Sequence, residues 1–145
     1  DSIRLTKSSS MITRGEHLVR LGGCETCHTP SDAEGFIRGL EFAGGKVFRH
    51  GDQAAASSNL TPDPSGIGYY DEELFVKAVK TGRVGARDIF SAMPWHFYRN
   101  LTDADLKAIF AYLQALPPVK HRVDNTEPLT PCPKCGNRHG FGNRN

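Results

Sequence analysis

Apolar residues recur with a helical period in three parts of the chain, and polar, glycine-rich stretches separate them. The pattern is clearest after Thr102, where four apolar residues follow the spacing i, i+3, i+4, i+7: Leu106, Ile109, Phe110 and Leu113. Thr102 is a favourable N-cap, aspartates occupy the first turn, and Pro117-Pro118 cannot continue a helix. This stretch is therefore predicted to be a helix.

Two shorter helices are predicted before it. The first begins at Thr13, which forms a capping box with Glu16 three residues later, and ends at the Gly22-Gly23 pair. The second opens at Asp71 and stops at Gly82. Its acidic residues lie at its start and its lysines in its last turns, which suits the helix dipole.

The other stretches are predicted to be loops or termini. Residues 1–12 are polar and serine-rich, and we expect them to form a flexible N-terminal arm. Residues 29–59 contain many glycines, which indicates ordered loop with a short hairpin around Phe42 to Phe48. Residues 59–68 combine prolines, which fix the backbone, with glycines, which permit positive φ.

Cys24, Cys27 and His28 form a CxxCH motif directly after the first predicted helix. This spacing is the attachment signature of a c-type haem. The two thiols lie about one helical turn apart and can add to the two vinyl groups on one porphyrin edge, while His28 offers an imidazole nitrogen to the iron. A disulfide, half a zinc site or a thioredoxin-like pair is the alternative for a CxxC. With no second CxxCH, one covalent haem c is expected.

A six-coordinate iron needs a second ligand opposite His28. Of the two methionines, Met11 precedes the first predicted helix, whereas Pro94 favours extended backbone at Met93, from which a thioether can point inward. Met93 is therefore the predicted distal ligand, with a gap-filling core methionine as the alternative. His96 is its main rival. Four further histidines are weaker rivals that we expect at the surface: His17, His50, His121 and His139.

Other residues are candidates for supporting roles around the haem. Trp95 carries an indole N–H that could bond a propionate. Asn59 could bond a propionate or organise its own turn, and both interpretations stay open. The second ring nitrogen of His28 should donate to a backbone carbonyl, for which Pro30 is a candidate.

Composition narrows the class of protein. The 145 residues fit one domain, and a hydrophobic content of 38% is low enough to suit packing around a macrocycle. The formal charge is +2 without a dense basic run, which argues against nucleic acid as a partner. No apolar run reaches the length of a membrane span. Since no leader is visible, we expect a mature chain in the bacterial periplasm after signal-peptide removal.

Cys132 and Cys135 form a second CxxC, but His139 follows at the wrong spacing for haem attachment. A local disulfide is the first interpretation, because an oxidising compartment is expected. A zinc site with His139 and another histidine is the second, since CPxCG resembles half a zinc ribbon. Free or intermolecular thiols are the third.

Several stretches resemble one family in the same order along residues 13–119. They are Arg14-Gly15-Glu16-His17-Leu18, Ser58-Asn59-Leu60-Thr61-Pro62-Asp63, Ala92-Met93-Pro94-Trp95 and Leu101-Thr102-Asp103-Ala104-Asp105-Leu106. The chain resembles class I cytochromes c, and within them the haem domains of bacterial alcohol and gluconate dehydrogenase cytochrome subunits. Residues 120–145 lie outside the pattern and are expected to be a tail-like extension.

The resemblance implies a fold and ligands. The fold is all-α, with three to five helices around one haem and long ordered loops. Cys24 and Cys27 are implied as thioether attachments, His28 as proximal ligand and Met93 as distal ligand. Gly15 is implied to let the first helix approach the last one near Phe110 and Tyr112.

The function expected from these features is one-electron transfer by a monohaem, monomeric cytochrome that is not itself an enzyme. Its partners would be redox proteins: a dehydrogenase, other cytochromes or a terminal oxidase. The alternative is a haem enzyme or gas-ligand sensor with a labile distal ligand.

Overall fold

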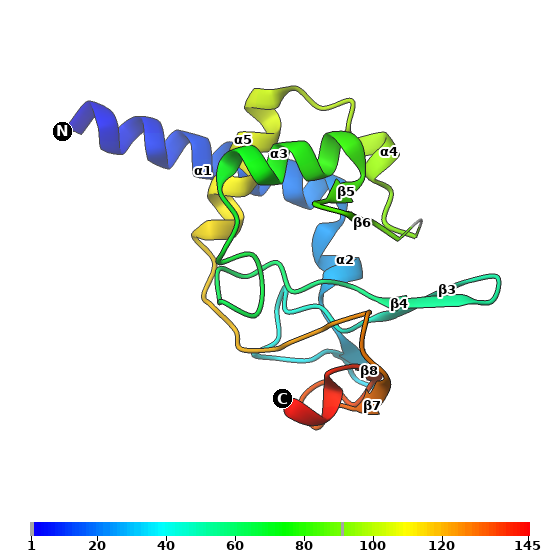
Figure 1. Cartoon of the computed structure of the whole chain (residues 1–145). Helices are drawn as coiled ribbons and strands as arrows, with labels where there is room; N and C mark the ends of the chain where they lie inside the picture. The colour runs from blue at the N-terminus through cyan, green and yellow to red at the C-terminus, as the bar shows by residue number, and fades with distance from the viewer. Residues whose placement is uncertain (1, 91) are drawn as a thin grey trace. The chain divides into compact units, whose positions relative to one another are not determined.

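The fold is described from a computed structural model covering residues 2–90 and 92–145, with backbone alone for residues 2–8. The described residues form five α-helices, one 3₁₀-helix and four two-stranded antiparallel sheets (Figure 1). They divide into two compact units. Unit 1 comprises the chain up to Gly22 together with Tyr70–Leu116, and unit 2 comprises Gly23–Tyr69 with Pro117–Asn145.

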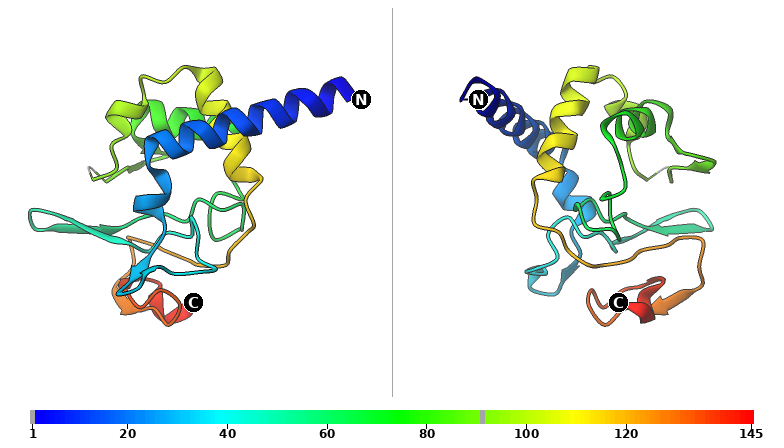
Figure 2. Two further views of the ribbon diagram at one scale, coloured as in Figure 1. Left: turned by 180° about the vertical axis from the view of Figure 1, so that it is seen from behind. Right: turned by 60° about the vertical axis from the view of Figure 1, so that its left-hand side comes forward.

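Unit 1 contains most of the helical residues. Its elements are α1 (Ser2–Gly22), α3 (Glu72–Thr81), β5 (Arg83–Val84), β6 (Arg87–Asp88), α4 (Trp95–Tyr98) and α5 (Asp103–Gln114). Helix α1 crosses α5, and α3 packs against both α5 and α4 (Figure 2). The buried side chains between them include Val19, Leu106 and Leu113. These residues are the core of unit 1.

A close backbone approach fixes the crossing of α1 and α5. A Cβ on Gly15 would lie 2.0 Å from the Ala108 carbonyl oxygen and 2.9 Å from Cβ of Tyr112. Only glycine fits at such a distance. The approach implied by the family resemblance is confirmed, and Ala108 is the residue met most closely.

The predicted caps of the two later helices are confirmed. The Asp71 carboxylate accepts from the Leu74 N–H at 2.7 Å, and Gly82 ends α3 at a φ of 70°. The Thr102 hydroxyl oxygen accepts from the Asp105 N–H at 3.1 Å at the start of α5. Local side-chain chemistry therefore sets these boundaries.

The start of the first helix differs from the prediction. Helix α1 begins at Ser2, so the backbone of residues 2–12 is helical and not an irregular arm. The Thr13 hydroxyl donates to the Ser9 carbonyl at 3.0 Å within the helix and does not act as a cap. Once a helix exists, each further residue adds a backbone hydrogen bond without a new nucleation cost.

Unit 2 consists mainly of loops held by short hairpins. Its elements are α2 (Cys24–His28), β1 (Ser31–Asp32), β2 (Gly35–Phe36), β3 (Val47–His50), β4 (Gln53–Ala56), β7 (Leu129–Pro131), β8 (Arg138–Gly140) and the 3₁₀-helix η1 (Gly142–Arg144). Each strand pairs with the next one in its sheet, β1 with β2, β3 with β4 and β7 with β8. A small core packs Leu40, Ala43, Cys132 and Cys135 together with Ile37 and Val119.

The hairpins correct the all-α prediction, because the described fold is mixed. The hairpin expected around Phe42 to Phe48 lies instead at β3–β4, where Val47 pairs with Ala56. Phe42 is buried in a loop at a φ of 61°. Its N–H donates to the Thr29 hydroxyl, and its carbonyl accepts from Leu60. These long-range bonds hold Phe42 outside any strand.

Residues 120–145 are not a separate tail. They share unit 2 with Gly23–Tyr69, and the Asn125 side chain bonds both the N–H and the carbonyl of Ala56, at 2.9 and 3.0 Å. The boundary predicted at 119/120 therefore does not divide the structure. None of the described helices combines the length and apolarity that a membrane crossing requires.

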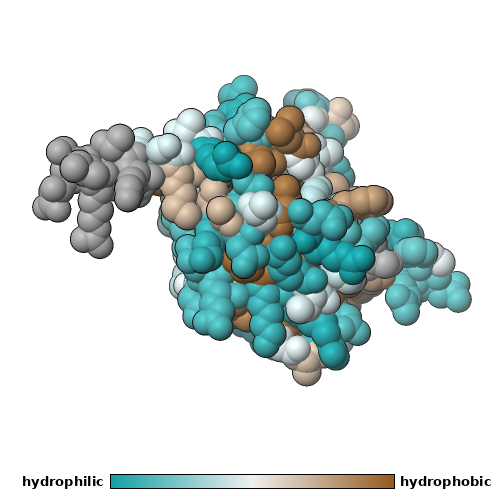
Figure 3. Space-filling view, turned by 90° about the horizontal axis from the view of Figure 1, so that it is seen from above, coloured by the Kyte–Doolittle hydropathy of each residue, from teal (hydrophilic) through white to brown (hydrophobic). Residues whose placement is uncertain are grey.

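The face of the molecule shown in Figure 3 is largely hydrophilic, with hydrophobic residues visible between the polar ones. Large exposed apolar side chains include Leu21, Tyr69 and Phe97.

Candidate haem site

The CxxCH motif forms a helix of its own. Helix α2 runs from Cys24 to His28, and Gly23 before it has a left-handed φ of 68°. No atom lies within 4 Å of a Cβ built on Gly23, so the backbone conformation alone favours glycine there. Cys24 and Cys27, three residues apart on this single turn, project from one side of it.

His28 is the best-defined side chain of the motif. It is 8% exposed, and its Nδ1 lies 2.7 Å from the Ser58 carbonyl oxygen. Since a carbonyl only accepts, Nδ1 carries the proton and Nε2 keeps its lone pair. Burial lowers the pKa of His28, and the bond to Ser58 opposes that shift in part. The ring is therefore a neutral imidazole with Nε2 available to a metal.

The Ser58 acceptor corrects the prediction of Pro30, whose carbonyl accepts from Ile37 instead. Ser58 is held by its neighbours, because Gly45 donates to Ser57 and Leu60 donates to Phe42. A Cβ on Gly44 would lie within 2.6 Å of the Ser57 and Ser58 backbone. The acceptor comes 30 residues after the ligand, so no local sequence signal points to it.

The two thiols of the motif are free and half-buried. Burial raises the pKa of Cys24 to about 11, so the unmodified side chain is a neutral thiol at physiological pH. Two free thiols on one turn and a neutral, oriented imidazole are the donor set that a c-type haem requires. The residues of unit 2 therefore fit the attachment of this group.

Met93 belongs to unit 1, where it precedes α4. It is half-buried, its N–H donates to the Phe90 carbonyl at 3.0 Å, and its carbonyl accepts from Trp95 at 2.8 Å. Ser91, two residues earlier, lies outside the described residues. Because Met93 and His28 lie in different units, their pairing as iron ligands stays a prediction.

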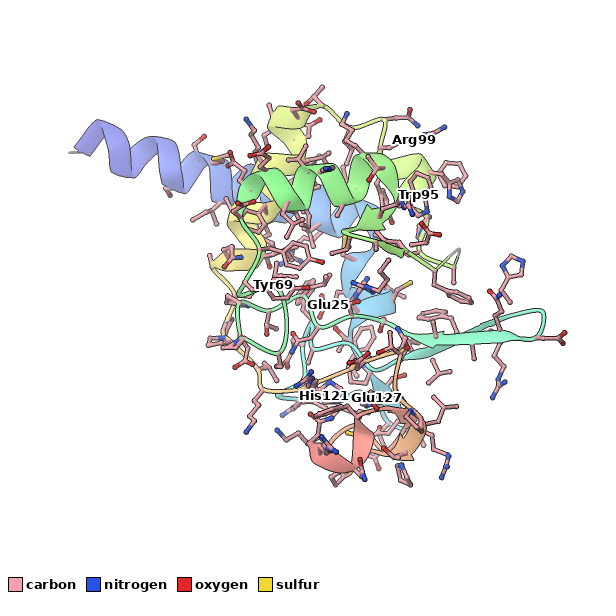
Figure 4. The ribbon with its side chains drawn as sticks, viewed as in Figure 1. Glu25, Tyr69, Trp95, Arg99, His121 and Glu127 are labelled. Atoms are coloured by element: carbon pink, nitrogen blue, oxygen red, sulfur yellow. The ribbon has the colours of Figure 1, made fainter. Side chains whose placement is uncertain are left out.

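Trp95 begins α4 and is half-buried. Its indole covers Gly82, where a Cβ would come within 2.4 Å of the ring. The Arg99 guanidinium lies 5.8 Å from the ring centroid (Figure 4), and His96, the rival ligand, is exposed beside it. These contacts fix the indole within unit 1, and its role toward a haem stays a prediction.

Asn59 is engaged on every side of its amide. Its Nδ2 donates to the carbonyls of Val119 and His121 at 2.9 and 3.0 Å, and its Oδ1 accepts from the N–H and hydroxyl of Thr61. It is 4% exposed. The bonds to Thr61 are those of a residue that organises its own turn, and a contact between Asn59 and a haem propionate stays a prediction.

The predicted surface histidines divide into two pairs. His17 and His50 are exposed as expected, whereas His121 and His139 are completely buried. The latter two lie with Cys132 and Cys135, and the ligand atoms of these four residues are all within 4.8 Å of one another. In the sequence, this cluster was indicated only by the Cys132/Cys135 pair with His139 four residues after it. No local motif marked His121 as the fourth member.

The chain is similar in sequence to several known bacterial proteins. No family model matches the chain. It is 36% identical over 119 residues to a component of the nicotinate dehydrogenase of Pseudomonas putida, covering 80% of this chain and 9% of that protein. Over 105 residues it is 36% identical to the cytochrome c subunit of the quinone alcohol dehydrogenase of Gluconobacter oxydans, covering 71% of this chain and 21% of the relative.

A third relative is the cytochrome c subunit of gluconate 2-dehydrogenase from Pantoea cypripedii, 36% identical over 109 residues, which cover 72% of this chain and 23% of the relative. The chain thus spans a quarter or less of the length of these relatives. Their similarity confirms the resemblance found in the sequence and implies a covalently bound haem c. The chain is therefore similar, over about 70% of its length, to the cytochrome c subunits of bacterial dehydrogenases, as its resemblance to class I cytochromes c implies.

Proposed function

We propose that this chain carries one haem c and transfers single electrons between redox proteins in the bacterial periplasm. The observation that supports this most directly is the buried His28 imidazole, oriented by the Ser58 carbonyl and preceded by two free thiols on one helical turn. A haem held there supplies one-electron iron chemistry.

Each residue of the motif has a separate task in this proposal. Cys24 and Cys27 hold the group through thioether bonds and prevent its loss. His28 binds iron through Nε2, while its Nδ1–H bond to Ser58 fixes the ring and increases its basicity. Met93 is proposed as the second ligand and Trp95 as a haem contact. A thioether in that position raises the potential relative to a second imidazole.

The names of the relatives support the choice of partners. Several are cytochrome subunits of dehydrogenases, and a further relative is the CcoP component of a cbb3-type cytochrome c oxidase. We therefore propose a dehydrogenase as electron donor, and another cytochrome or a terminal oxidase as acceptor. The chain itself acts as a monomeric carrier and not as a catalyst.

Intact-mass analysis and spectroelectrochemistry on the purified holoprotein test this proposal together. The expected results are the mass of one haem added to the chain, low-spin spectra in both oxidation states and a single one-electron wave. A chain without covalent haem contradicts the proposal. High-spin spectra with rapid carbon monoxide binding favour the haem enzyme or gas sensor instead.

The two methionines provide a matched pair for the second ligand. Met93→Leu should abolish the methionine-to-iron charge-transfer band of the ferric protein and lower the midpoint potential. Met11→Leu, in α1, should leave both unchanged. If Met93→Leu keeps the band and His96→Ala alters the ferric spectrum, Met93 is not the ligand.

A further inference from the structure

Four side chains of unit 2 converge in its interior, away from the CxxCH motif in the sequence. His121 follows the Pro117-Pro118 pair, Cys132 and Cys135 lie in the turn between β7 and β8, and His139 lies in β8. Figure 4 shows His121 close to the β7–β8 hairpin. None of the four residues is more than 4% exposed. Bulk solvent therefore does not reach their polar atoms.

The distances suit a single ion. All four ligand atoms lie within 4.8 Å of one another, and Nε2 of His121 is 3.5 Å from Sγ of Cys132. In a tetrahedral zinc site, ligand atoms are separated by about 3.3 to 3.8 Å. A small contraction of the cluster around an ion would bring every ligand atom to its bonding distance.

The imidazoles are oriented from outside the cluster. Nδ1 of His121 lies 2.8 Å from the Ala43 carbonyl oxygen, and Nδ1 of His139 lies 2.8 Å from that of Gly140. Each Nδ1 therefore carries a proton, and each Nε2 keeps its lone pair. Nε2 of His139 is buried and has no hydrogen-bond partner among the described residues. A buried acceptor without a donor calls for a ligand that is absent from the polypeptide.

The two cysteines have the backbone support of a metal knuckle. Cys132 donates its N–H to Asn137 and accepts from Gly136, both at 2.9 Å, and Gly136 has a left-handed φ of 76°. The Asn137 N–H also bonds the Cys135 sulfur. A Cβ on Gly45 would lie 2.6 Å from Cε1 of His121 and 3.2 Å from Sγ of Cys135. The glycine backbone therefore packs directly against these two side chains of the cluster. Such N–H···S bonds stabilise a metal-bound thiolate.

The same geometry disfavours the disulfide first suggested by the sequence. Both thiols are free in the structure. A disulfide would leave the Nε2 lone pairs of His121 and His139 buried beside an apolar sulfur pair, which is costly. The two negative charges of the thiolates would balance the charge of a divalent ion, and no carboxylate takes part in the cluster.

We propose that unit 2 contains a structural zinc site whose ligands are Nε2 of His121 and His139 and Sγ of Cys132 and Cys135. Two sulfur and two imidazole ligands in a closed, buried shell are typical of structural Zn²⁺. The ion would tie the β7–β8 hairpin to the segment that contains His121. This proposal stands independently of the haem, because none of the four residues belongs to the CxxCH motif.

Metal analysis of tag-free holoprotein, purified without chelators, tests the proposal. We expect one zinc per chain, and X-ray absorption at the zinc edge should show two sulfur and two nitrogen neighbours. The absorption edge of zinc is separate from that of haem iron, so failure of either assignment is seen by itself. Absence of zinc, or an intact mass two hydrogens lower with the two cysteines joined, overturns the proposal.

Variants assign the ligands. His139→Ala and Cys135→Ser should each lower zinc content at least tenfold, while the exposed His17→Ala should retain one equivalent. Where a variant does not fold, the zinc-edge spectrum of the unmodified protein still decides the ligand set. Full zinc content with an unchanged spectrum in folded His139→Ala contradicts the assignment.

Discussion

The side-chain amide of Asn59 donates a 3.0 Å hydrogen bond to the backbone carbonyl of His121, 62 residues later in the chain. Asn59 follows Ser58, whose carbonyl orients the His28 imidazole. The segment that contains His121 is therefore linked through one residue to the loop that supports the predicted iron ligand.

Asn59→Ala should destabilise the protein by about 2 to 4 kcal/mol, because it leaves the buried carbonyl of His121 and the Thr61 N–H without partners. Denaturant unfolding of the holoprotein measures this. Asn100→Ala is the control, since exposed Asn100 makes one bond to Phe97, and it should cost less than about 0.5 kcal/mol. Equal effects of the two variants would contradict the role given to Asn59.

Gly44→Ala should raise the midpoint potential, on the order of tens of millivolts. The added Cβ would lie 2.4 Å from the Ser57 carbonyl oxygen and would displace the Ser58 carbonyl from His28. A weaker Nδ1–H bond makes the imidazole a poorer electron donor, which destabilises the ferric state.

Gly51→Ala is its control. Gly51 has a similar positive φ of 61°, but no atom lies within 4 Å of the Cβ position. The Gly51→Ala substitution therefore adds a similar backbone strain but makes no contact with the loop that contains Ser58. A potential that shifts equally in both variants would show that strain alone, and not the hydrogen bond, is responsible.

The stability change caused by Gly15→Ala has opposite signs depending on whether residue 15 is open or closely packed. In an open helix position this change stabilises a protein by about 0.5 to 1 kcal/mol. Here the Cβ would meet the Ala108 carbonyl at 2.0 Å, so we expect a loss of about 2 to 3 kcal/mol as α1 and α5 are forced apart. Thermal unfolding checks this, with exposed Ser10→Ala in α1 as a neutral control. A stabilised Gly15→Ala protein would refute the close crossing.

Asp105 links pH to stability. The Arg14 side chain donates to its carboxylate, with Nε at 3.0 Å, and this bond holds the pKa of Asp105 below its ordinary value. Because the pKa of Asp105 is lower in the folded state, its bond to Arg14 contributes fully to folding stability above the unfolded-state pKa. This contribution is lost as the pH falls through the folded-state pKa.

Asp105→Asn should therefore be less stable than the parent at neutral pH, and the difference should shrink below about pH 4. Denaturant titrations between about pH 7 and about pH 2.5 span this range and measure it. Asp103→Asn, in the same helical turn but 3.6 Å from Lys80, should give a smaller difference at neutral pH. A pH-independent gap for Asp105→Asn would contradict the coupling to Arg14.

The sequence predicted the features that depend on neighbours along the chain. Cap residues such as Asp71 and Thr102 act within three residues, so their helices begin where predicted. The CxxCH spacing suffices to identify the attachment motif, because one helical turn places both thiols and the imidazole together.

The sequence did not determine features that depend on contacts between distant segments. The acceptor for His28, the burial of His121 and His139, and the incorporation of residues 120–145 into unit 2 all arise when the chain folds back on itself. A polar residue shows no local sign of whether a remote carbonyl or thiol will meet it. The sequence alone thus determined the CxxCH motif and the class of chemistry that it predicts, whereas tertiary structure decided which distant backbone carbonyl meets His28 and which four side chains of unit 2 converge.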